Sequence, residues 1–139
     1  MERHEFNQDQ VDAAIDYVSA NGAQDRASTI SYSRVFAEGS LPPPQLLHQS
    51  QEPHLVSKFM EAFHYRCIER EMPPLDALVV HVAAERKDFP GTGYFRVNGY
   101  DDPLNERTKP ERVIAATRFW EQQKAECERW GTMERRGHN

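Results

Sequence analysis

The amino-acid sequence predicts an α+β fold with three main helices and a small antiparallel β-hairpin sheet. Apolar residues recur at helical spacing in three segments, 7–22, 53–71 and 108–130. Two other segments, 75–84 and 94–98, have the composition and spacing of strands, and a Pro-Gly turn separates them. Because strands close in sequence commonly pair as an antiparallel hairpin, we expect these two segments to form the sheet.

The first helix is predicted from its N-terminal residues. Asn7 is a favourable N-cap, and Gln10 stands three residues later in the position of a capping box. Asn21-Gly22 is expected to end the helix, since both residues tolerate a left-handed backbone. One apolar stripe is predicted to face the core: Val11, Ala14, Ile15 and Val18.

A short strand at 29–31 and a short helix ending at Gly39 are predicted next, with Ser31 or Ser33 as the N-cap of that helix. Three consecutive prolines, 42–44, are incompatible with a helix interior. The stretch from there to Glu52 is therefore expected to be a loop or at most one helical turn.

The longest amphipathic pattern in the first half of the chain predicts a helix over 53–71. Pro53 suits the first helical position, and apolar residues follow at intervals of three and four. Met72-Pro73-Pro74 is expected to terminate this helix. The strand predicted at 75–84 is apolar on both faces, so we expect it to be covered on two sides.

The last predicted helix begins at a second capping box, formed by Thr108 and Glu111. It is expected to run to about Trp130 and to stop at Gly131. We therefore predict a single globular domain over 1–131, followed by a flexible tail over 132–139.

The predicted order of elements resembles a winged-helix arrangement. In that arrangement the hairpin is the wing, and the third helix, here 53–71, is the helix presented to a partner. The chain is also similar in size, composition and the segment Pro-Pro-Leu-Asp-Ala-Leu-Val-Val at 73–80 to small orphan proteins of bacterial mobile elements and integron gene cassettes. The second resemblance implies no particular function.

Charge and cysteine content narrow the function classes. The chain has 17 basic and 22 acidic residues, a net charge of −5, which disfavours nucleic acid and anionic lipid as partners. The acidic excess lies in residues 1–52, which form a solvated surface or dock on a basic partner. No apolar run is long enough to span a membrane, and the N-terminus has no signal-peptide pattern. Cys67 and Cys127 are expected to be free thiols in a reducing cytoplasm.

The function predicted first is a binding or adaptor module that acts through protein contacts, because no complete catalytic constellation is present. No catalytic residue, metal ligand or cofactor is assigned from the sequence. The binding residues are expected on and beside the hairpin, where basic and aromatic side chains gather: His81, Arg86, Lys87, Tyr94 and Arg96.

Two other functions remain open. Weak nucleic-acid binding would use Arg86, Lys87 and Arg96, although three charges make a small phosphate footprint. A small enzyme would have its site between helix 53–71 and the strands and would use the candidate residues His64, Cys67 or His81. For each of these three residues the competing interpretation is a packed core side chain. In the presented helix the charges offset one another: Lys58, Arg66 and Arg70 against Glu61, Glu69 and Glu71.

The last helix also predicts a homodimer. Neighbouring helical residues point about 100° apart, so Phe119 and Trp120 are not expected to share one buried stripe. Tryptophan is enriched at the centres of protein interfaces. A two-fold interface is therefore predicted around Trp120 and Trp130.

Overall fold

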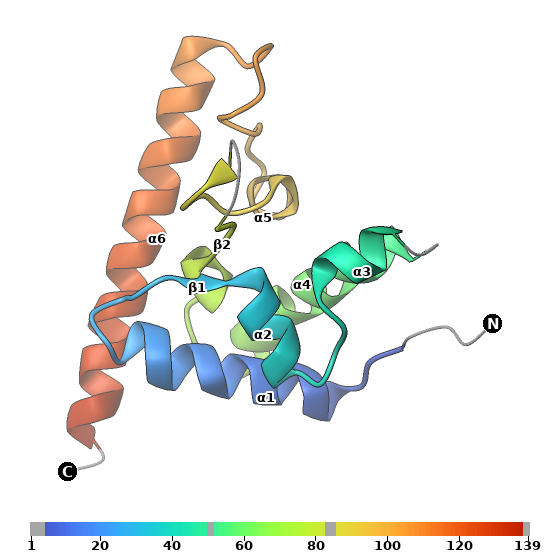
Figure 1. Ribbon diagram of the computed structural model, residues 1–139. Helices are drawn as coiled ribbons and strands as arrows, with labels where there is room; N and C mark the ends of the chain where they lie inside the picture. Colours follow the sequence, from blue (N-terminus) through green and yellow to red (C-terminus); the bar gives the residue numbers. More distant parts are fainter. Residues whose placement is uncertain (1–4, 50–51, 83–85, 138–139) are drawn as a thin grey trace.

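The computed structural model describes residues 5–49, 52–82 and 86–137, and the fold is mostly helical (Figure 1). The long helix α6 runs along one side of the molecule, and the end of α1, continued by η1, packs against the C-terminal half of α6. The helices α3 and α4 lie away from α6, while β2 and α5 lie between them. The elements in chain order are α1 (Gln8–Val18), the π-helix η1 (Ser19–Ala23), β1 (Ile30–Ser31), α2 (Tyr32–Glu38), α3 (Pro44–Gln49), α4 (Pro53–Glu69), the 3-10 helix η2 (Leu75–Leu78), β2 (Val79–Val80), α5 (Thr92–Val97) and α6 (Pro110–Gly137).

The predicted fold class is wrong. The described residues contain six α-helices and a two-stranded parallel sheet, in which Ile30 pairs with Val79 and Ser31 with Val80. Within the described residues, the segments 75–82 and 94–98 do not pair as an antiparallel hairpin, so the wing of the expected winged-helix arrangement is not formed there. The second predicted strand, 94–98, lies mostly in α5.

Packing explains why this segment is helical. Tyr94 and Phe95 are both buried, at 6% and 0% exposed. Adjacent side chains of a strand point to opposite faces, whereas α5 places both rings against the protein, beside α4 and α6. An alternating pattern of five residues is too short to distinguish the two periodicities. The residues predicted as a strand at 75–84 form η2 and then only the short strand β2.

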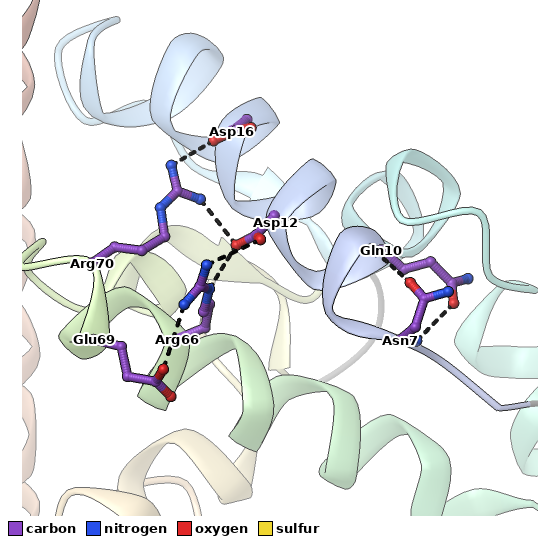
Figure 2. Close-up of polar contacts among 7 residues, drawn as sticks. All are labelled: Asn7, Gln10, Asp12, Asp16, Arg66, Glu69 and Arg70. Carbon is purple, nitrogen blue, oxygen red and sulfur yellow. Dashed lines mark hydrogen bonds and ion pairs between the residues drawn. The ribbon is translucent and has the colours of Figure 1, made fainter.

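The N-terminal half follows the local signals closely. Asn7 and Gln10 form the predicted capping box, with hydrogen bonds of 3.0 and 2.9 Å (Figure 2). Ser31 caps α2 by accepting from the amide of Arg34, and Gly39 ends that helix. The predicted apolar stripe of α1 is buried: Val11, Ala14, Ile15 and Val18.

Two predicted boundaries in this half differ from the structure. The α1 segment does not end at Asn21-Gly22 but continues through the π-helix η1. Gly22 packs against β1 and η2, where an added Cβ would lie 3.0 Å from the carbonyl oxygen of Ser28. The stretch expected to be a loop contains α3, which begins at Pro44. Proline is compatible with a first helical turn, so three prolines exclude only the helix interior.

The arginines of α4 bind the acidic face of α1 (Figure 2). Asp12 accepts from Arg66 Nε at 2.9 Å and from Arg70 Nη1 at 3.2 Å, and Asp16 accepts from Arg70 Nη2 at 2.8 Å. The hydrogen bond from Arg66 lowers the pKa of Asp12, so this carboxylate stays charged in mildly acidic solution. These ion pairs link α1 to α4, and the positive and negative charges within them compensate each other.

The helix α6 is anchored through buried side chains along its length. Trp120 is 5% exposed, and its indole N–H donates to the carbonyl of Ala77 at 2.8 Å. Trp130 is partly buried against the core. The predicted stop at Gly131 is wrong, because α6 continues to Gly137. Residues 138–139 of the predicted tail lie outside the described residues. Within the described part of the chain, no helix has the length and apolarity needed to cross a membrane.

Candidate functional site

A cavity of about 580 Å³ lies between α4 and two stretches of chain, residues 80–82 and 91–97. The start of α2 and one face of α3 complete its wall. Apolar side chains line part of it: Val56, Met60, Val80, Val82 and Val97. Polar side chains line the rest, among them Tyr32, His48, Asp76, His81 and Arg96. This size and mixed lining are typical of sites for small organic molecules, which run from about 300 to 1,000 Å³.

Gly91 brings two polar side chains together at the cavity wall. Its amide donates to the hydroxyl of Tyr32 at 2.7 Å, and the Tyr32 ring stacks on His81 with centroids 4.6 Å apart. A Cβ on Gly91 would lie 3.3 Å from both His81 Nε2 and Tyr32 Oη. The absence of a side chain at this position therefore keeps both polar atoms accessible to a ligand.

The backbone fixes His81 in this position. Its amide donates to the carbonyl of Phe89 at 2.9 Å, and its carbonyl accepts from Asp88 at 2.8 Å. Burial, together with the positive charges of Arg86 and His48, lowers the pKa of His81. The imidazole is consequently neutral at pH 7, with one nitrogen able to donate a hydrogen bond and the other able to accept one.

A buried acid–base pair supports the wall on the α4 side. Asp76 is 3% exposed and accepts from His64 Nδ1 at 3.0 and 3.2 Å. Burial acts to lower the pKa of His64, but the hydrogen bond and the charge of Asp76 outweigh it and raise the pKa. His64 thus orients Asp76 from behind, and Asp76 contributes to the cavity lining.

Cys67, the proposed partner of His64 in an enzyme site, lies in the apolar core. It is fully buried, and burial raises the pKa of its thiol to about 12. The thiol is protonated at neutral pH, whereas nucleophilic cysteines act as thiolates. Cys67 is a core side chain in this fold, as the competing interpretation of the sequence had it.

Tyr94 contributes a second phenol to the cavity lining. Its ring packs against Phe95 and Phe119, and burial raises its pKa, so the hydroxyl keeps its proton. Among the described residues, this buried hydroxyl has no hydrogen-bond partner. Buried polar groups are nearly always hydrogen-bonded in folded proteins. A hydroxyl without a protein partner at a cavity is a group that a ligand or a bound water can satisfy.

The five residues predicted to bind a partner do not lie together. His81, Tyr94 and Arg96 line the cavity, whereas Arg86 and Lys87 do not. Arg86 donates to both carboxylate oxygens of Asp102, at 2.8 and 3.0 Å, and is therefore held in a structural ion pair. Lys87 is exposed, and its backbone forms an isolated parallel β-bridge with the backbone of His81.

The sequence reasoning missed several features of this site. The sequence places Gly91 in a turn but does not connect it with Tyr32 or Asp76, since their meeting depends on contacts between distant segments. A second hollow of about 460 Å³ was also missed; it lies on the other side of α5, over residues 100–112. Its signal in the sequence was the cluster of basic residues Arg107, Lys109 and Arg112. Within 5–49, 52–82 and 86–137, no group of three His, Cys, Asp or Glu residues could hold a metal ion.

Comparison with known proteins does not identify a family for this chain. No family model, curated protein or solved structure matches it. The resemblance to orphan proteins of mobile elements stays a prediction.

Proposed function

We propose that this protein binds a small organic molecule in the cavity between α4 and residues 80–82 and 91–97. The observation that carries the proposal is the set of polar groups around Gly91, where Tyr32 Oη and His81 Nε2 face the same small space. The volume of about 580 Å³ is sufficient for a ligand with one or two rings.

The cavity lining favours a ligand with both polar and apolar parts. Asp76 offers acceptor oxygens, Tyr94 offers a donor, and His81 offers one of each. The valine side chains and Met60 provide an apolar surface for a ring. Such a combination fixes orientation by hydrogen bonds and provides affinity by burial.

The other functions predicted from the sequence have less support from particular contacts. Asp12 of the acidic segment 1–52 is paired with Arg66 and Arg70 of the helix predicted to be presented to a partner, so these three charges compensate one another within the chain. Trp120 is packed against η2 in the core. A protein-contact role, a homodimer, a cytoplasmic location and a catalytic role for His81 remain predictions.

The experiment is a screen of small ring compounds by two-dimensional amide NMR, with Gly91→Ala as the test variant. The added Cβ would come within 3.3 Å of His81 Nε2 and Tyr32 Oη, so we expect affinity to fall about tenfold. Gly137→Ala is the matched control, because Gly137 does not line the cavity and its Cβ would meet no atom within 4 Å.

Two results would contradict the proposal. One is that no compound at millimolar concentration shifts the signals of cavity residues. The other is that Gly91→Ala, shown by its melting curve to be folded, binds the same compounds as tightly as the wild type.

A further inference from the structure

The second hollow adjoins the cavity at α5. Thr92 and Arg96 line both spaces, so α5 forms the wall between them. The hollow lies over the segment 100–112, next to the start of α6. A ligand seated in the cavity and extending past Arg96 would enter it.

The two acidic side chains of this hollow are each paired with an arginine. Asp102 is paired with Arg86 and also accepts from Thr92 Oγ1 at 3.2 Å. Asp101 accepts from Arg112 at 2.6 Å. Burial acts to raise the pKa of Asp102, but the hydrogen bonds from Arg86, the Leu104 amide and Thr92, together with the charge of Arg86, outweigh it and keep this pKa below its ordinary value. Both carboxylates therefore have a basic partner within the chain.

Three basic side chains of the same hollow are not compensated. Among the described residues, Arg96, Arg107 and Lys109 have no acidic partner. The chain as a whole has a net charge of −5, so this concentration of unpaired positive charge is opposite in sign to the protein average. Positive charges that line a concave surface attract and retain anions.

The number of unpaired charges favours a phosphate over a carboxylate. A phosphate monoester carries about −1.5 to −2 charges at pH 7 and has three strong acceptor oxygens. A carboxylate carries a single charge and two oxygens. Arginine pairs with phosphate through two parallel hydrogen bonds, and two of the three free side chains are arginines.

We propose that the ligand is a phosphate monoester of a ring-bearing molecule, with its ring in the cavity and its phosphate in the hollow lined by Arg96, Arg107 and Lys109. This inference rests on the proposed function and specifies the chemical class of the ligand. Arg96 is the residue that joins the two parts of the site, because its side chain borders both.

Phenyl phosphate, phenol and inorganic phosphate are the probes for the test, titrated into the full chain and followed by amide NMR. At about 25 mM salt we expect phenyl phosphate to bind at least about tenfold more tightly than phenol, and at about 250 mM salt most of this advantage should disappear. Signals of the cavity and of residues 107–109 should shift together.

The double variant Arg107→Gln/Lys109→Gln, which changes residues of the hollow that do not line the cavity, should lose the preference for phenyl phosphate while keeping its affinity for phenol. Arg118→Gln is the matched control, because Arg118 is exposed on α6 and lines neither space. We expect this control to bind phenyl phosphate like the wild type. Inorganic phosphate alone should shift residues 107–109 more weakly than phenyl phosphate does.

Several outcomes would overturn the inference. If phenol and phenyl phosphate bind the cavity equally well at low salt, the phosphate class is wrong while the proposed cavity function stands. If neither binds, both are wrong. If the double variant keeps the preference, the hollow is not the phosphate site. If a short DNA duplex displaces phenyl phosphate at a lower concentration than phenyl phosphate itself requires, the hollow binds a nucleic-acid backbone instead.

Discussion

Substitution of Gly131 by alanine tests the packing of α6 against η1. Gly131 lies inside α6 with a negative φ, so its backbone accepts alanine, and helix propensity alone would stabilise the variant by about 1 kcal/mol. The added Cβ, however, would overlap the carbonyl group of Ala23 and come within 2.8 Å of the amide nitrogen of Gln24. These neighbours are backbone atoms of η1 and its C-cap, which cannot rotate away as a side chain can.

Overpacking of this kind costs roughly 1–3 kcal/mol, and a backbone contact belongs at the upper end of that range. After the gain in propensity is subtracted, we expect a net loss of about 2 kcal/mol. For a chain of this length that corresponds to a fall in Tm of about 6–8 °C. Urea denaturation and thermal melting measure both quantities.

Gly137→Ala is the matched control, because a Cβ at that position would meet no atom within 4 Å. We expect this variant to be as stable as the wild type or slightly more stable. If Gly131→Ala also melts at or above the wild-type temperature, the close approach of α6 to η1 is wrong. The helix would then end near Gly131, as the sequence predicts.

Three further predictions concern charge and hydrogen bonding. Asp12→Asn should lose about 1 kcal/mol of unfolding free energy in urea at low salt and less at high salt. The control Asp9→Asn removes only a first-turn charge and should lose a few tenths of a kcal/mol. Equal losses would show that the ion pairs do not link α1 to α4. The pKa of His64 is raised in the folded state. The stabilisation that protonated His64 provides is therefore complete below pH 6.5, the pKa of the unfolded state, and is lost as the pH rises through the pKa of the folded state. The stability difference between the wild type and His64→Gln, measured in urea from about pH 5.5 to 8.5, should therefore shrink with rising pH; a constant difference would refute the role given to Asp76. Trp120→Phe should lose about 1–3 kcal/mol, since the buried carbonyl of Ala77 then has no donor, and an unchanged urea midpoint would contradict this.

The features predicted well are those that depend on neighbouring residues. The capping box of α1 involves Asn7 and Gln10, three residues apart, and its hydrogen bonds form within one helical turn. The same holds for Ser31 as the cap of α2. The helix predicted over 53–71 is observed as Pro53–Glu69, because one long apolar stripe defines it. Interactions between residues a few positions apart determine each of these features, so the sequence alone is enough to predict them.

The candidate site was only partly predictable. His81, Tyr94 and Arg96 were named from the sequence and do line the cavity. They were assigned to a hairpin, however, and Arg86 and Lys87 were grouped with them. Tyr32 and Gly91, whose hydrogen bond spans 59 positions of the chain, could not be connected without the fold.

The sequence by itself determined where the main helices α1 and α4 lie, how α1 and α2 begin and which side chains of α1 face the core. Tertiary structure alone decided that 94–97 is helical, that α6 passes through Gly131, and that a cavity opens beside Gly91. The physical reason is the range of the interactions. Caps and apolar stripes act within a few residues, whereas the burial of Tyr94, the contact of Gly131 with Ala23 and the pairing of Arg86 with Asp102 require distant segments to meet.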